Sequence, residues 1–403
     1  MGVCVSHKEP GQASSPCKAV TTTSIVSKPT RERLSIWKFR GSGEEELSPE
    51  AFVQLYNTRR NSEFHRAVSK SCIDKLYSRE EDDENGTIRY MRKVTIDTAL
   101  SPKRQLQFEE KKVHISGDCI PTDYLSSLGI AVTCRKGLKP ESPNQDDYSI
   151  YIDHGEMMLG VFDGHGPDGH QVAGFIHKEL PKLITEEEKF ASKPVEAFTP
   201  AFEKCQVALE NHCDEQRTFD CVVSGATATI ALIRGGTISC AHVGDSRAVL
   251  SRKLPNGNRS SIDLTNDHKP TIAEERSRIE KNRGEVKQLM GDITARVFVK
   301  GKDFPGLAMS RVLGDLLAQE IGVVCQPELK EYEVTAEDEF VLVCSDGVWE
   351  FISSLEAVKL VARFGRENVN GAVEGLAQEA WNRWQLAYPE TVDDITVLVA
   401  YLH

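Results

Sequence analysis

Short apolar stretches separated by turn residues run along the chain from about residue 124 to its end. Their lengths and β-branched residues predict strands over 129–134, 148–152, 157–162, 226–233, 237–244, 247–252, 340–345 and 394–402. Apolar residues at helical spacing predict helices over 169–184, 197–213, 353–364 and 370–384. Because the strands form clusters and the helices fall in separate blocks, the pattern predicts an α+β layered fold rather than a parallel βαβ array.

The residues before these strands differ from them in composition and periodicity. Residues 1–43 carry seven Lys or Arg against two Glu, with little periodicity, and are predicted to form a flexible basic arm. Residues 44–120 are predicted to be a partly helical extension, because Ser48 can cap a helix and Pro49 suits its first turn. The globular domain is therefore expected over 121–403.

Composition and charge argue against several classes of protein. The chain has 403 residues and a formal net charge of -12, which argues against nucleic acid as a partner. We find no apolar run long enough to span a bilayer, and no apolar core of a secretory signal at the start of the chain. The eleven cysteines include no Cys-x-x-Cys pair, so we expect reduced thiols in a cytosolic setting and no zinc site.

Aspartates recur at the ends of the predicted strands. The stretch "DGHGPDGH" follows the strand at 157–162, which is apolar on both faces, and its glycines permit a tight turn and close backbone approach. A single aspartate at a strand end is usually a turn former. Clustered carboxylates repel one another unless a cation neutralises them, and all-oxygen ligands favour Mg²⁺ or Mn²⁺. The candidate ligands are Asp146, Asp163, Asp245, Asp346 and Asp393.

Seven motifs occur in an order that resembles the protein phosphatase 2C family of metal-dependent serine/threonine protein phosphatases. They are "VFDGHGPDGHQVA", "SGATATIAL", "AHVGDSRAVL", "DHKP", "GLAMSRVLGD", "VLVCSDGVWE" and "DDITVLV". The resemblance implies a four-layer α-β-β-α sandwich with two central antiparallel sheets. It also implies two Mn²⁺ or Mg²⁺ ions that share a bridging water, phosphorylated proteins as substrates, and a monomer.

The resemblance assigns roles to individual residues. Asp163 is similar to the aspartate that bridges both ions, and Gly164 to the residue whose carbonyl binds one of them. Asp346 and Asp393 resemble the carboxylates that complete that ion's shell, and Asp146 resembles an outer-shell ligand of the other ion. His165 matches the general acid that protonates the leaving serine or threonine oxygen.

Two departures from the family pattern concern phosphate binding and a third metal site. Lys136 stands where the family has a phosphate-binding arginine, and Arg135 beside it is the alternative. Glu350 stands where an aspartate often completes a third, weaker metal site with residues like Asp245 and Asp346.

The start of the chain, "MGVCVS", fits a myristoylation pattern at Gly2, and Cys4 is suitably placed for palmitoylation. A myristoyl chain alone binds membranes only marginally, so a second signal is expected from Cys4 or from "RERLSIWKFR" at 31–40. These features predict attachment to the cytoplasmic face of a membrane. A partner-binding strand is the alternative for residues 31–40.

Two other functions are compatible with the same motifs. One is a pseudophosphatase that serves as a binding or scaffold module, and the other is a metal-dependent phosphoesterase of a small molecule. Retention of Asp163, His165, Asp346 and Asp393 argues against the pseudophosphatase, whereas the lysine at position 136 is its only support.

Overall fold

The computed structural model describes residues 88–94, 111–115, 124–139, 142–153, 155–289 and 294–403, the first two ranges by their backbone alone. Every described residue lies in one compact unit of the chain, residues 80–403. The predicted arm, most of the predicted extension, and the helix expected near Ser48 lie outside the described residues. No helix among the described residues has the length and apolar character needed to cross a membrane.

The larger of the two main sheets is antiparallel, and its two longest strands, β4 and β5, are neighbours. Its order is β15-β8-β7-β5-β4-β1-β2, and the two-residue strand β6 joins β5 to β14 at one end. The bounds are β1 (Ile88–Val94), β2 (Lys111–Ile115), β4 (Asp146–Asp153), β5 (Glu156–His165), β6 (Gly225–Ala226), β7 (Ala228–Arg234), β8 (Thr237–Val243), β14 (Leu313–Gly314) and β15 (Glu328–Glu333).

The second main sheet is also antiparallel and packs against the first. Its order is β10-β9-β16-β17-β3. A buried core of apolar side chains from both sheets, including Leu159, Val161, Val343 and Leu398, lies between them. The bounds are β3 (Ile130–Arg135), β9 (Arg247–Lys253), β10 (Arg259–Asp263), β16 (Asp338–Cys344) and β17 (Ile395–Tyr401).

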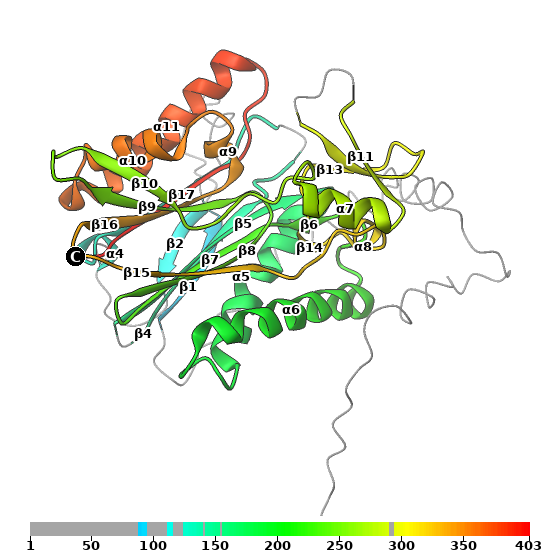
Figure 1. The fold of residues 1–403 in the computed structure, drawn as a ribbon, viewed down its shortest axis with the longest axis horizontal. Helices are drawn as coiled ribbons and strands as arrows, with labels where there is room; N and C mark the ends of the chain where they lie inside the picture. The colour runs from blue at the N-terminus through cyan, green and yellow to red at the C-terminus, as the bar shows by residue number, and fades with distance from the viewer. Residues whose placement is uncertain (1–87, 95–110, 116–123, 140–141, 154, 290–293) are drawn as a thin grey trace, which may run out of the picture. The chain divides into compact units, whose positions relative to one another are not determined.

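Helices cover the outer faces of the two sheets, as Figure 1 shows. Helices α5 (Gly169–Glu186) and α6 (Pro194–Gln216) pack on the first sheet through a core that includes Phe162, Phe198 and Phe202. Helices α10 (Ser354–Ala362) and α11 (Val369–Ala387) pack on the second through a core that includes Trp381 and Val397. The α-β-β-α sandwich is therefore confirmed.

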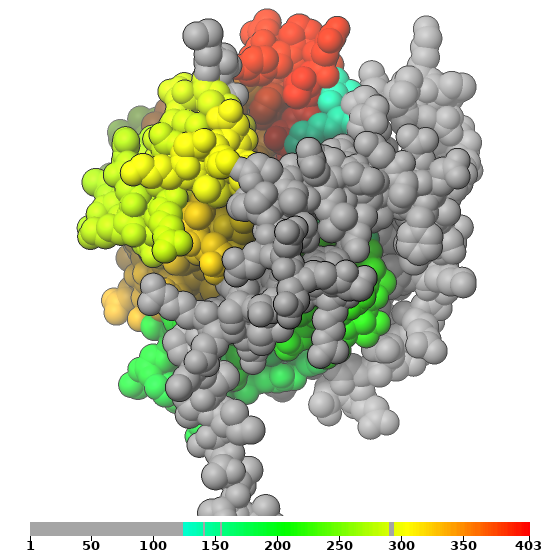
Figure 2. All heavy atoms as spheres, turned by 90° about the vertical axis from the view of Figure 1, so that its right-hand side faces the viewer, coloured from blue at the N-terminus to red at the C-terminus, as the bar shows by residue number. Residues whose placement is uncertain are grey.

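A smaller lobe projects beside the sandwich. It contains helix α7 (Ala273–Lys281) and a three-stranded sheet of β11 (Gly284–Lys287), β12 (Arg296–Val299) and β13 (Pro305–Leu307), which share their own apolar core. Figure 2 shows the lobe, in yellow-green and yellow, at the surface. The remaining short helices are α4 (Tyr124–Ser127), α8 (Leu316–Gln319), α9 (Asp346–Trp349) and the 3-10 helix η3 (Arg366–Asn368).

The predicted strands and helices of the domain all occur, with shifted ends. Strand β5 continues through Asp163 and Gly164 to His165, where the sequence predicts a turn. The described part of the extension, residues 88–94 and 111–115, forms β1 and β2, which pair with each other, and β1 also pairs with β4. The strands of the small lobe, at most four residues long, escaped the pattern analysis.

Candidate functional site

Five aspartates meet where strand ends of the two main sheets converge. Asp146 and Asp163 face each other as cross-strand partners of β4 and β5. Asp245 lies between β8 and β9, Asp346 begins α9 directly after β16, and Asp393 precedes β17. The charges of the other four act on Asp163, which places all five in one electrostatic cluster. We call these five residues the carboxylate cluster.

The carboxylate cluster is unfavourable when all its members are ionised. Burial, followed by the charges of Asp146 and Asp346, raises the pKa of Asp163 far above its usual range. Burial and the charges of Asp393 and Asp245 do the same to the pKa of Asp346. Burial and nearby carboxylates also raise the pKa of Asp146 to about 7. Such a cluster favours positive charge in its midst.

Neighbouring groups hold Asp146 of the carboxylate cluster and the adjacent Asp394 in place. Asp146 accepts hydrogen bonds at Oδ2 from the hydroxyls of Ser345 and Thr396, both at 2.7 Å. Asp394, which follows Asp393, accepts from the backbone N–H groups of Gly137 at 2.7 Å and Gln145 at 2.8 Å. Asp394 therefore ties the loop after β3 to the start of β17.

Two lysines supply positive charge to the carboxylate cluster. The ammonium group of Lys139 pairs with Asp393, and that of Lys269 pairs with Asp245 at 2.6 Å. Burial opposes the charge of Lys139, but Asp393 and Asp394 outweigh it and raise the pKa of this lysine. Both ammonium groups are therefore charged at neutral pH.

The donor set fits a hard divalent cation. Among the described residues, no three His, Cys, Asp or Glu side chains converge tightly enough to hold an ion as they stand. The cluster nevertheless offers the oxygen ligands that Mg²⁺ and Mn²⁺ prefer, and Asp245 Oδ1 is buried with no hydrogen-bond partner among those residues. A Cβ at Gly164 would lie 2.7 Å from the Gln145 carbonyl oxygen, so only glycine brings its backbone into this position.

His165 borders the carboxylate cluster at the last position of β5. Its Nε2 is hydrogen-bonded to the carboxylate of Asp315, which follows β14. Burial works against the charged imidazole, but the nearby Asp315 outweighs it and raises the pKa of His165. The arrangement can hold a proton beside the carboxylate cluster and release it to a neighbouring atom.

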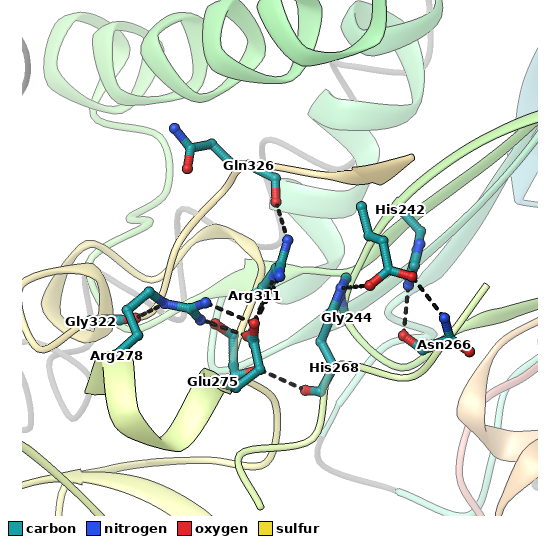
Figure 3. A network of polar contacts seen from close by, with 11 residues as sticks. His242, Gly244, Asn266, His268, Glu275, Arg278, Arg311, Gly322 and Gln326 are labelled. Atoms are coloured by element: carbon teal, nitrogen blue, oxygen red, sulfur yellow. Dashed lines mark hydrogen bonds and ion pairs between the residues drawn. The ribbon is translucent and has the colours of Figure 1, made fainter. Parts of the chain in front are cut away.

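A buried polar network supports the loop that carries Asp245 (Figure 3). The backbone N–H of Gly244 donates to His268 Nδ1 at 3.1 Å, and His268 stacks on His242 with ring centroids 4.3 Å apart. Burial lowers the pKa of both imidazoles, so they are neutral and Nδ1 can accept.

The network continues into helix α7 through a buried carboxylate. Glu275 accepts hydrogen bonds from Arg278, Arg311 and the Ser310 hydroxyl. Ser310 also donates from its backbone N–H to the carbonyl of His268 at 2.9 Å. The network thus joins the small lobe to the segment that leads to Asp315.

The remaining predicted site residues are Arg135, Lys136, Glu350, Gly2 and Cys4. Arg135 forms an ion pair with Glu374 of α11, so its guanidinium is held at that helix. Lys136 is half-buried and forms no hydrogen bond or ion pair within the described ranges. The side chain of Glu350 is exposed just after α9. Gly2 and Cys4 lie outside the described residues.

Four polar residues of the site were not predicted from the sequence. Lys139 and Asp394 lie close to predicted residues but were given no role. Lys269 and Asp315 stand inside the quoted motifs "DHKP" and "GLAMSRVLGD", which were the signal that could have found them.

Comparison with known proteins gives a consistent family match. The model of the family "Protein phosphatase 2C" matches residues 152–384. "Probable protein phosphatase 2C 64" of Oryza sativa subsp. japonica is 36% identical over 277 residues, which cover 66% of this chain and 63% of that protein. "Probable protein phosphatase 2C 72" of Arabidopsis thaliana is 33% identical over 271 residues, which cover 64% of this chain and 81% of that protein.

Solved structures share the fold at lower identity. A serine-threonine phosphatase 2C from Toxoplasma gondii is 19% identical with a TM-score of 0.58, and the match covers 77% of this chain and 98% of that one. A C. elegans sex determining protein is 20% identical with a TM-score of 0.57, and the match covers 68% of this chain and 64% of that one. At these identities the likeness establishes the sandwich alone.

Proposed function

Because the chain belongs to the protein phosphatase 2C family of metal-dependent serine/threonine protein phosphatases, we propose the following reaction for it. It hydrolyses phosphoserine and phosphothreonine in proteins, using two Mn²⁺ or Mg²⁺ ions held by its carboxylate cluster. The observation that carries this proposal is the convergence of five aspartates, in which burial and the charges of the other four raise the pKa of Asp163.

The metal-holding residues follow from their positions. Asp163, the carbonyl of Gly164, Asp346 and Asp393 would hold one ion, with Asp163 and Asp146 serving the other. When bound, the ions would acidify a water molecule for attack on phosphorus and neutralise charge on the phosphoryl oxygens. A third ion, at Asp245 and Asp346, would need a movement of the exposed Glu350.

Lys139 and His165 complete the mechanism, the first as a phosphate-binding cation and the second as a general acid. Lys139 offers its ammonium group, one-third exposed, at the edge of the carboxylate cluster, where it can bind a phosphate oxygen. His165 gives a proton to the serine or threonine oxygen as the bond to phosphorus breaks. We place phosphate binding at Lys139 rather than Lys136, because Lys139 has the contact with Asp393.

The decisive experiment measures release of phosphate from a phosphoserine peptide with and without Mn²⁺. We expect hydrolysis with Mn²⁺ and none after chelation. Binding of the peptide without hydrolysis would indicate a pseudophosphatase. Hydrolysis of small phosphate esters alone would indicate a phosphoesterase of a small molecule.

A substitution series tests the phosphate-binding residue. A hydrogen bond to a charged group contributes about 1.5 to 3 kcal/mol, so Lys139→Met should raise KM for the phosphopeptide by about ten-fold or more. Lys136→Met is the matched control and should leave KM close to wild type. A large effect of Lys136→Met with none of Lys139→Met would restore the assignment made from sequence. Mn²⁺ titration of each variant separates phosphate binding from loss of metal.

We also propose that Gly2 is myristoylated and that the protein acts as a monomer at the cytoplasmic face of a membrane. The support is the pattern "MGVCVS" and the basic segment at 31–40. Gly2→Ala should move the protein to the soluble fraction of cells with full phosphatase activity, and Cys4→Ser should release part of it. A Gly2→Ala protein that stays with membranes would refute the anchor. The mass of the protein in solution tests the monomer.

A further inference from the structure

Two short strands, β6 and β14, bring Asp315 to His165 at the end of β5. The two-residue strand β6 pairs on one side with the end of β5, where His165 and Gly225 are partners. On its other side β6 pairs with β14, where Gly314 and Gly225 are partners. The residue after Gly314 therefore arrives beside the residue that ends β5, although 150 positions separate them.

The carboxylate of Asp315 is built into the protein rather than lying on its surface. Asp315 is 3% exposed, and its backbone adopts the left-handed conformation with φ at 49°. Its N–H donates to the carbonyl of Ser224 at 2.9 Å, and the next N–H, of Leu316, donates to Cys221 at 3.1 Å. A non-glycine residue adopts this conformation at a cost, and it persists only where its surroundings fix it.

Gly225 provides the space for the pair. A Cβ at this position would lie 2.9 Å from His165 Nε2 and closer still to Asp315 Oδ2. The backbone φ of Gly225 is not in the left-handed region, so steric clearance is what requires glycine here. Any larger residue would push the imidazole and the carboxylate apart.

The other ring nitrogen of His165, Nδ1, is buried in the structure. Nδ1 has no hydrogen-bond partner among the residues that the structure describes. A carboxylate at Nε2 keeps a proton on that nitrogen in both charge states of the ring. Nδ1 is therefore the nitrogen whose proton can leave.

We propose that Asp315 is the positioning residue for His165, holding Nε2 so that Nδ1 delivers the proton to the leaving serine or threonine oxygen. This inference rests on the proposed role of His165 as general acid. In the step, the bond from phosphorus to the serine oxygen breaks, and that oxygen keeps the electron pair and takes the Nδ1 proton. Water supplies the hydroxyl that bonds to phosphorus, and the proton it releases returns through solvent to Nδ1.

The test compares a phosphoserine peptide with p-nitrophenyl phosphate, whose leaving group needs little protonation. Asp315→Asn is nearly isosteric, and asparagine tolerates the left-handed conformation, so the variant should fold. We expect kcat on the peptide to fall by about 10- to 100-fold, with little change on p-nitrophenyl phosphate. The double variant with His165→Gln should lose no more than His165→Gln alone.

Two further variants keep the test decisive. Gly225→Ala retains both partners but separates them, and it should reproduce the selective loss even if Asp315→Asn folds poorly. Asp338→Asn removes another buried aspartate, one paired with Arg252, and should show no substrate selectivity.

Equal losses on both substrates would overturn the role of Asp315. A double variant whose loss is the product of the two single-variant losses would overturn it as well. If His165→Gln itself shows no selectivity, the general acid has been misassigned. If wild type leaves the peptide intact in the presence of Mn²⁺, the proposed function fails instead.

Discussion

Asp163→Asn and Asp346→Asn should each lower Mn²⁺-dependent turnover by at least about a thousand-fold. Asp163 is central to the carboxylate cluster, because the charges of the other four aspartates act on it. Asparagine keeps the size of the side chain and removes the charge that holds a divalent cation. The measurement is kcat on a phosphoserine peptide across a wide range of Mn²⁺ concentration. Near-normal activity in either variant would show that the metal centre lies elsewhere.

The same substitution should stabilise the metal-free protein. The pKa of Asp163 is raised in the folded state, so the folded state binds its proton more tightly than the unfolded state. Stability at this site therefore falls as the pH rises above the unfolded pKa of about 4. At pH 7, Asp163→Asn should raise the melting temperature by about 2 to 8 °C, and the gain should vanish near pH 4.

Asp338→Asn is a control with the opposite sign. Burial opposes the ionised form of Asp338, but the hydrogen bond from Arg252 outweighs burial and lowers the pKa of this carboxyl group. The charge of Asp338 therefore stabilises the fold at pH 7. Removing that charge should lower the melting temperature and leave Mn²⁺-dependent catalysis in place. A fall in stability for Asp163→Asn as well would mean that its carboxylate is stabilised in the metal-free protein.

The layers of the fold could be predicted because the apolar residues of each strand indicate which of its faces are buried. In β17, Val397 and Val399 pack toward helix α11, whereas Leu398 and Ala400 pack toward the other sheet. A strand covered on both faces is apolar throughout, which gives a strong signal. The small lobe gives a weak one, because its strands have at most four residues.

The aspartates could be predicted for a related reason. Asp163 follows an apolar run directly and Asp346 follows one after a single serine, and a charge beside a buried strand is conspicuous. Lys139 was missed because it stands in a loop with prolines and serine, where a lysine normally faces solvent. Its position depends on the packing of Gly137, where a Cβ would collide with the backbone of Val392 and Asp393.

Asp315 shows the limit of sequence patterns most clearly. Its proximity to His165 depends on β6 and β14, each two residues long, which no hydrophobic period can indicate. The separation of 150 positions also removes any local signal. The pair follows only from the assembled sheet.

His165→Gln should reduce turnover more for a substrate with a poor leaving group than for one with a good leaving group. A general acid contributes about 10² to 10⁴-fold when the departing oxygen needs a proton. A serine alkoxide needs one, so the loss on a phosphoserine peptide should lie in that range. The p-nitrophenolate ion leaves unprotonated near neutral pH, so the loss on p-nitrophenyl phosphate should be much smaller. The ratio of the two losses is the quantity to measure.

Metal binding must be separated from acid catalysis in this variant, because His165 follows Gly164 and Asp163 directly. Titration with Mn²⁺, followed by the rise in melting temperature, measures ion binding without turnover. If glutamine weakened ion binding, both substrates would suffer alike, and saturating Mn²⁺ would restore both. A selective loss that persists at saturating Mn²⁺ can come only from the proton. Equal losses at saturation would instead make His165 a residue that orients the metal ligands beside it.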